Sequence, residues 1–269
     1  MSVQPQQLGE PLNVFGRMGR TVITTLHGAG QGGMILAQAI FFIPSMFTPR
    51  RMHNVLFHMY LTGIKSLGVI TVVAMFTGMI LALQTGLELR RFNQEVNIGT
   101  AVTVVMMREM GPFMTALIIA ASVGSSIGAQ LGTMKVSEEI DALEIMSINP
   151  VRFLVTPRLV ALMVMLPILT IYTNILGSVG GAIVGKTQLG VSFRAFFDNA
   201  QLYAANKDLY VGLFKAFLFG NIIAAVACHQ GLTAQHGAVG VGLATRRTVI
   251  LSFLIILVVG YMTTRLFYV

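Results

Sequence analysis

Five stretches of the sequence contain no Asp, Glu, Lys or Arg and consist largely of apolar residues, at 66–87, 110–134, 159–185, 216–245 and 248–264. Each has about 17 to 30 residues, and an α-helix of about 20 residues crosses the hydrocarbon core of a bilayer. Charged residues make up only 10% of the chain, against about a quarter in soluble proteins. The sequence therefore predicts an all-α integral membrane protein with about five transmembrane helices.

The chain divides into an N-terminal region, 1–63, and a transmembrane domain, 64–269. The apolar stretch 34–47 is too short to span a bilayer and is followed by Pro49, Arg50 and Arg51, so we expect an interfacial or re-entrant helix at the cytoplasmic face. Five crossings place the two termini on opposite sides. With the N-terminus cytoplasmic, ten Lys and Arg residues lie inside and seven outside, which favours this orientation and a C-terminus on the outer side of the membrane. Lys and Arg do not cluster into a patch, so no nucleic-acid partner is expected.

Two sequence patterns match catalytic motifs but occur in the wrong context. Residues 180–187, GGAIVGKT, fit the phosphate-loop pattern, yet they end a long apolar run and no strand precedes them. Residues 124–128, GSSIG, fit the nucleophile elbow but read as membrane helix. The five histidines and Cys228 show no metal-ligand spacing. We therefore predict no catalytic residue, no metal site and no cofactor in this chain.

Glycines recur at every fourth residue in two of the apolar runs. One trio is Gly124, Gly128 and Gly132, and the other is Gly177, Gly181 and Gly185. On a helix, each trio forms a groove in which another backbone can approach closely. Chance spacing is the alternative, since glycine is common in membrane helices.

Two adjacent charges, Arg108 and Glu109, interrupt an otherwise apolar region and are followed by Gly111-Pro112. They mark either the outer end of a long helix or a backbone break inside the membrane, because proline kinks a helix or begins a new one. Adjacent helical residues point about 100° apart, so the two charges cannot pair along one face. A cavity or another helix must meet at least one of them.

A short polar segment, 135–157, separates the second and third runs. We predict that Ser137 caps a helix with Glu138 and Glu139 in its first turn, and that Asn149-Pro150 ends it. Such an amphipathic helix suits docking of a soluble partner, or it is an ordinary interfacial helix.

The residues that resemble a known family form one long block and one short block. The long block comprises Arg108-Glu109-Met110-Gly111-Pro112, Gly124-Ser125, Gly132-Thr133-Met134-Lys135-Val136, Glu138-Glu139-Ile140-Asp141-Ala142-Leu143, Asn149-Pro150-Val151-Arg152-Phe153 and Pro157-Arg158. The short block, Gly237-Ala238-Val239-Gly240-Val241-Gly242, is similar to the family's last cytoplasmic loop. The sequence thus resembles the MlaE/YrbE family of ABC transporter permeases. The resemblance implies a permease subunit in the bacterial inner membrane that moves phospholipids or related lipids between the inner membrane and the outer envelope.

The resemblance also implies partners and site residues. The partners are a second copy of the chain, two ABC ATPase subunits, a periplasmic MCE-domain protein, lipids and, in some systems, a small cytoplasmic STAS-type subunit. The ATPase-coupling helix corresponds to Glu138, Glu139, Ile140, Asp141, Leu143, Glu144 and Met146. The lipid pocket corresponds to Leu81, Gln84, Phe92, Arg108 and Glu109, with Arg108 as the first choice for headgroup contact.

The chain departs from the family pattern at three places. Ala121-Ser122 replaces a frequent Gly-Arg, Leu243 replaces an Arg, and Gly260 replaces an Asp. The lost charges leave the headgroup open and allow a less polar lipid. Two other functions also stay open: a secondary transporter or channel, and a non-transporting scaffold for the MCE-domain protein.

Overall fold

The computed structural model describes residue 28 and residues 30–235 and 237–269. Within these ranges all regular secondary structure is helical. A helix over residues 30–41 precedes the following elements: a 3₁₀ turn Ile43–Phe47, α2 Pro49–Thr62, α3 Leu67–Arg91, α4 Ile98–Val105, α5 Gly111–Ile119, α6 Ser125–Val136, α7 Glu139–Ile145, α8 Thr156–Gln188, α9 Phe193–Tyr203, α10 Asn206–Leu232 and α11 Gly237–Tyr268. The all-α class is confirmed. The first 27 residues of the predicted N-terminal region lie outside the described part.

Within the described residues five helical runs are long and apolar enough to cross a membrane, as predicted, but their bounds differ from the charge-free stretches. They are Met52–Arg91, Glu95–Val136, Val151–Gln188, Asn206–Leu232 and Gly237–Tyr268. The fourth begins ten residues before the predicted 216, because Asp208 and Lys215 are buried with partners and do not mark a helix end. A turn at 233–235 interrupts the predicted 216–245 run. The segment expected to be the last cytoplasmic loop instead forms the first turns of α11.

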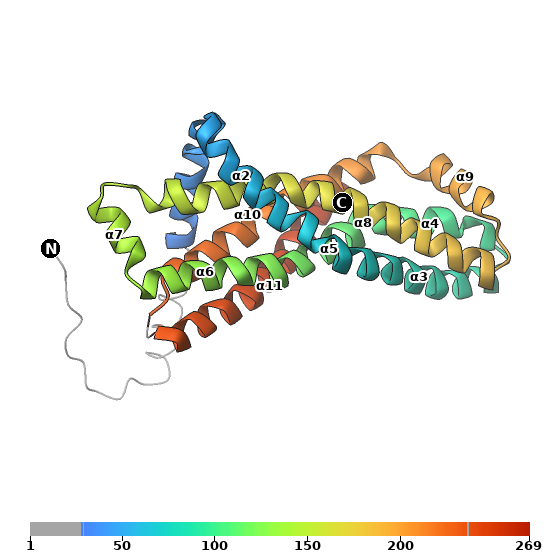
Figure 1. The fold of residues 1–269 in the computed structure, drawn as a ribbon. Coiled ribbons are helices and arrows are strands. Elements are labelled where there is room, and N and C mark those ends of the chain that lie inside the picture. Colours follow the sequence, from blue (N-terminus) through green and yellow to red (C-terminus); the bar gives the residue numbers. More distant parts are fainter. Residues whose placement is uncertain (1–27, 29, 236) are drawn as a thin grey trace.

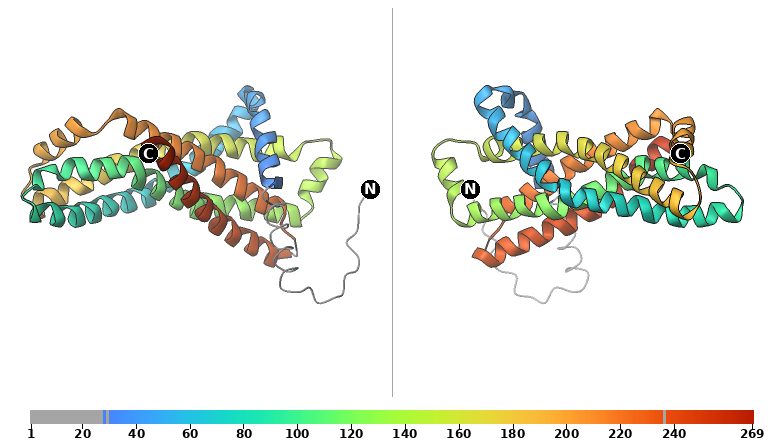
Figure 2. Two further views of the ribbon diagram at one scale, coloured as in Figure 1. Left: turned by 180° about the vertical axis from the view of Figure 1, so that it is seen from behind. Right: turned by 45° about the vertical axis from the view of Figure 1, so that its right-hand side comes forward.

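The helices form an elongated bundle whose two ends differ (Figure 1). At one end lie α7, the end of α10 and the start of α11. At the other end lie α9 and the connection from α3 to α4, and the views in Figure 2 show the same arrangement. The C-terminus stops short of this second end. Helices α3, α4 and α8 therefore continue past the point at which α11 ends.

Helix α8 is the central support, and its closest packing depends on glycine. A Cβ on Gly78 of α3 would overlap the backbone of Gly177, and one on Gly180 would overlap the backbone of Met75. In the other trio, Gly124, Gly128 and Gly132 face Ile223, Thr248 and Ala234. The predicted close backbone approach is present at the second trio, where Gly177 and Gly181 meet Gly78, whereas the first trio faces side chains.

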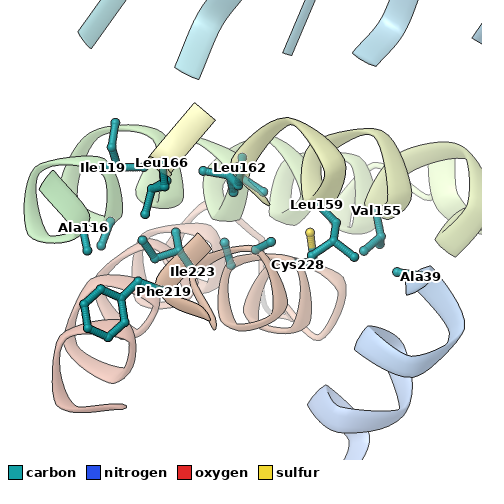
Figure 3. Close-up of a cluster of buried hydrophobic side chains, with 14 of the residues drawn as sticks. Ala39, Ala116, Ile119, Val155, Leu159, Leu162, Leu166, Phe219, Ile223 and Cys228 are labelled. Atoms are coloured by element: carbon teal, nitrogen blue, oxygen red, sulfur yellow. The ribbon is translucent and has the colours of Figure 1, made fainter. Parts of the chain in front are cut away.

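Two clusters of buried side chains fill the bundle. The larger joins α5, α6, α8 and α10, and Figure 3 shows Ile119, Leu162, Leu166, Phe219 and Ile223 converging in it. Cys228 is also buried there as a free thiol. The smaller cluster lies toward the α9 end and is composed of Ala82, Ile98, Val102, Met106, Ala182, Val191 and Phe196.

The second long helix contains two π-helical turns, Met106–Met110 and Ala120–Gly124. The first directly precedes Gly111-Pro112. Proline cannot donate to the carbonyl four residues earlier, and the ring crowds that carbonyl, so the wider turn accommodates the proline without ending the helix. The predicted backbone irregularity is thus present as a π-turn within a continuous helix, and it contains Arg108 and Glu109.

Candidate functional site

The first π-turn directs Arg108 and Glu109 toward two other helices, α10 and α11. The Nε of Arg108 donates to Oδ1 of Asp208 at 2.6 Å, and its Nη2 donates to Oδ2 at 3.2 Å. The hydroxyl of Tyr268 donates to the same Oδ1 at 2.8 Å. The Arg108 guanidinium also stacks over the Tyr268 ring, 4.5 Å from its centre. Arg108 is therefore held in one orientation by a bidentate pair and an aromatic face.

Glu109 belongs to a second ion pair, whose cation, Lys215, lies two turns further along α10 than Asp208. Nζ of Lys215 donates to Oε1 of Glu109 at 2.7 Å, to the carbonyl of Arg108 at 2.9 Å and to Oγ1 of Thr264 at 2.7 Å. Thr264 lies 2.7 Å from the same Glu109 oxygen. All three N–H donors of the ammonium thus have acceptors.

These residues form one polar network, which consists of Arg108, Glu109, Asp208, Lys215, Thr264 and Tyr268. Asp208 and Lys215 are only 1% exposed, whereas the side chains of Arg108 and Glu109 are each 40% exposed. Burying one unpaired charge here would cost several kcal/mol, so each buried ion needs its partner. The two cations and two anions cancel, and the half-exposed Arg108 and Glu109 are the members that a ligand can reach.

The structure unites only part of the predicted lipid pocket. Leu81 packs against the small apolar cluster together with Met110, beside the π-turn. Gln84 and Phe92 lie further along α3 and are exposed, Phe92 at the end of that helix. Arg108 and Glu109 instead face α10 and α11.

Four members of the network were not predicted from the sequence: Asp208, Lys215, Thr264 and Tyr268. Lys215 directly precedes the charge-free run 216–245, so its position in the sequence indicates a helix end outside the membrane. A usable signal was present, since Asp208 and Lys215 are seven residues apart, and so lie on one helical face two turns apart. Thr264 and Tyr268 are four residues apart, on neighbouring turns of one face of α11.

The segment predicted to be the coupling helix does form a helix, α7. The prediction that Ser137 caps this helix was wrong. Ser137 ends α6, and Glu138, with a left-handed φ of 60°, precedes α7 without a side-chain cap. This tight reversal is clasped by an ion pair between Lys135 and Asp141 at 2.6 Å. The polar segment therefore forms a tight corner at the end of α6.

The two faces of α7 differ in exposure. Ile140 is buried and Leu143 packs against the large core. Ile145 and Met146 are 85% and 61% exposed, next to the exposed carboxylates of Glu139 and Glu144. Two large apolar side chains at the tip of a polar corner form a candidate docking surface, which we call the α7 tip.

The two rejected catalytic motifs lie inside helices. Residues 180–187 are continuous α-helix within α8, and residues 124–128 belong to the second long helix. Neither forms the loop that phosphate binding or a nucleophile elbow requires. In the part of the chain covered by the structure, no three His, Cys, Asp or Glu side chains are grouped to hold a metal ion.

Five membrane-length helices around a network of paired buried charges define a multi-pass membrane protein with a polar site inside its bundle. The sequence comparisons identify the family. The family model Permease MlaE matches residues 55–266, and the chain belongs to this family.

Curated relatives agree with this assignment over nearly the whole chain. A probable ABC transporter permease protein of Rickettsia felis is 34% identical over 259 residues, covering 96% of this chain and 98% of the relative. The intermembrane phospholipid transport system permease protein MlaE of Haemophilus influenzae is 30% identical, with 96% and 98% coverage. The chloroplastic protein TRIGALACTOSYLDIACYLGLYCEROL 1 of Arabidopsis thaliana is 32% identical, with 80% and 61% coverage. The chain is thus an ABC transporter permease.

Proposed function

We propose that this permease moves phospholipids or related lipids between the bacterial inner membrane and the outer envelope, with energy from ATP hydrolysis in a separate ABC ATPase. The single observation that most supports this is the half-exposed Arg108 and Glu109 at the π-turn, in a chain similar to a phospholipid transport permease. A charged pair at this depth belongs to a site where a polar headgroup can be received. ATP and Mg²⁺ would bind the ATPase subunit.

The lipid site in this proposal is built from Arg108 and Glu109, with Leu81, Gln84 and Phe92 of α3 along the path of the acyl chains. Arg108 has five N–H donors, of which two serve Asp208. The remaining donors can bind a phosphate oxygen while Asp208 keeps the guanidinium in place. Because the four network charges cancel, affinity should depend little on the net charge of the lipid, which fits a zwitterionic or weakly polar headgroup.

Coupling to the ATPase would pass through α7, with Glu138, Glu139, Ile140, Asp141, Leu143, Glu144 and Met146 as its members. The exposed pair Ile145 and Met146 would enter a groove of the ATPase, and Ile140 and Leu143 would transmit the movement to the core. Helix α7 follows α6 after only two residues, Ser137 and Glu138, so a movement of α7 would be passed directly to α6. Helix α6 continues from the same long helix that contains Arg108, so one element connects the α7 tip to the lipid site.

The assembly that we propose contains two copies of this chain, two ATPases and a periplasmic MCE-domain protein, with room for a small STAS-type subunit. In this arrangement the α7 end and the N-terminus are cytoplasmic and the C-terminus is periplasmic. The inner membrane of a bacterium is the expected location.

The test is co-purification from membranes in mild detergent, followed by ATP-dependent transfer of a fluorescent phospholipid between proteoliposomes. Replacing Ile145 and Met146 with Arg should release the ATPase and abolish transfer, because both side chains are exposed and the fold does not need them. The matched control is Leu202→Arg, an equally exposed residue of α9 at the opposite end, which should retain the ATPase. If the native chain retains no ATPase, or transfer proceeds without ATP, a channel, secondary transporter or scaffold replaces this proposal.

A further inference from the structure

A polar hollow of about 300 Å³ lies between α2, α6 and α8, on the α7 side of the bundle. This volume is at the lower end of the range for ligand pockets. Figure 1 shows the three helices that enclose it, with α2 crossing α8. The lining contains Arg158, Lys65 and His58 together with hydroxyl and amide side chains, and it includes no Asp or Glu. The hollow is thus a pocket with basic groups and no acid.

Arg158 is the most informative member of this lining because it is buried without a counter-ion. Its side chain belongs to a residue only 6% exposed. Nη1 donates to the carbonyl of Leu154 at 2.7 Å, and Nη2 makes a long bond of 3.4 Å to Gln130. Its Nε has no partner, and no carboxylate in the described ranges pairs with it. Three of the five guanidinium N–H groups therefore have no protein acceptor.

A buried guanidinium without an anion is costly inside a membrane protein. Among the described residues the other buried cation, Lys215, is paired with Glu109, and Arg91, Arg108, Lys135 and Arg194 also have carboxylate partners. Arg158 differs from them, and the second cation of the hollow, Lys65, also has no ion pair among the residues that the structure covers. The site therefore has the charge, the donors and the space for an anion.

We propose that this hollow binds a phosphate group, with the Arg158 guanidinium and the Lys65 ammonium as its cations. The hydroxyl of Ser126, which lines the same hollow, faces the ligand. A tetrahedral oxyanion matches the fork of donors on an arginine and takes a point charge from lysine. The phosphate belongs either to a lipid headgroup or to a free anion, and the experiment below separates the two.

The depth of the site favours contact with headgroups. Arg158 is seven residues from the start of its long helix at Val151, and this corresponds to about 10 Å of rise. That is within reach of the polar layer of a bilayer at the α7 end. The pocket is separate from the Arg108 network, so binding here does not depend on transport and can be measured without an ATPase.

The experiment uses the full chain purified in a non-ionic detergent, with three probes: inorganic phosphate, phosphatidylglycerol and diacylglycerol, which lacks phosphate. Native mass spectrometry measures retained lipid, and thermal stabilisation measures phosphate binding. Arg158→Gln should weaken binding of the phosphorylated probe about tenfold or more. Ser126→Leu should do the same, because it fills the hollow while both cations stay. Arg246→Gln, which removes an exposed cation from α11, should leave this binding unchanged.

Each outcome decides a specific point. Binding of phosphatidylglycerol alone assigns a lipid headgroup, and binding of inorganic phosphate alone assigns a free anion. If Arg158→Gln fails to fold, Ser126→Leu and Lys65→Gln give the answer, since both positions are exposed. The proposal is overturned if these variants bind phosphorylated probes as the native chain does, or if diacylglycerol binds equally well. Either failure leaves the proposed transport function untouched.

Discussion

Replacing Lys215 with Met removes a buried ammonium that satisfies three acceptors: Glu109, Thr264 and the carbonyl of Arg108. The shape of the methionine side chain fits the space, so the main loss is electrostatic. Glu109 then keeps a charge within the bundle with only Thr264 as a donor. Removing one partner of a buried ion pair costs about 3–5 kcal/mol. Because Glu109 is 40% exposed and its charge is partly screened by solvent, we expect a loss of stability at the lower end of this range, about 3 kcal/mol.

The assay heats the detergent-purified protein at one fixed rate and uses size-exclusion chromatography to measure how much protein stays folded at each temperature. A loss of about 3 kcal/mol should lower the midpoint by roughly 6–12 °C for a chain of this size. The matched control is Lys207→Met, because Lys207 lies on the same helix and is exposed. Its ammonium lies 5.0 Å from the centre of the Tyr268 ring and forms no ion pair with the residues that the structure describes, so the control should shift the midpoint by no more than about 2 °C.

The double variant Lys215→Met with Glu109→Leu completes the test. It removes both charges, so much of the lost stability should return, since an apolar pair can replace a buried ion pair at little cost. Two results would show that charge pairing does not stabilise the network. One is that Lys215→Met is no more destabilising than Lys207→Met. The other is that the double variant loses as much stability as the two single changes added together.

Three further predictions concern packing, the α7 corner and the lipid site. Gly78→Ala should cost about 1–3 kcal/mol in thermal unfolding because its Cβ meets the backbone of Gly177, whereas Gly68→Ala, with open space around it, should be neutral or stabilising; equal midpoints would contradict the close approach of α3 and α8. Lys135→Gln should change stability by less than about 1 kcal/mol, because its pair with Asp141 is 33% and 49% exposed, and a larger drop would show that the clasp holds α7 in place. Asp208→Asn should lower lipid transfer in proteoliposomes at least tenfold by releasing Arg108, while ATPase retention stays normal; unchanged transfer would count against Arg108 as the headgroup contact.

The sequence alone determined that this is a helical membrane protein, because the composition of each segment indicates whether lipid or water surrounds it. Long charge-free runs have one stable solution in a bilayer, the helix, since every backbone polar group must be satisfied internally. The five membrane helices and the α7 corner were predictable on this basis. The family was recognisable from local motifs such as Arg108-Glu109 with Gly111-Pro112 and the segment from Glu138 to Leu143.

Only the tertiary structure decided which charges belong to the interior. Lys215 reads as a helix end in the sequence, because a lone lysine beside an apolar run is normally solvated, and its partners lie about 50 and 105 residues away in α11 and the π-turn. Side-chain exposure on α7 also depended on the tertiary structure. The resemblance places Leu143 in the coupling helix, yet this side chain packs on the core, and Ile145 and Met146 are exposed. Charge pairing and side-chain exposure both depend on which helices become neighbours, and helix neighbours are set by long-range packing through residues such as Gly78 and Gly177, beyond what local periodicity specifies.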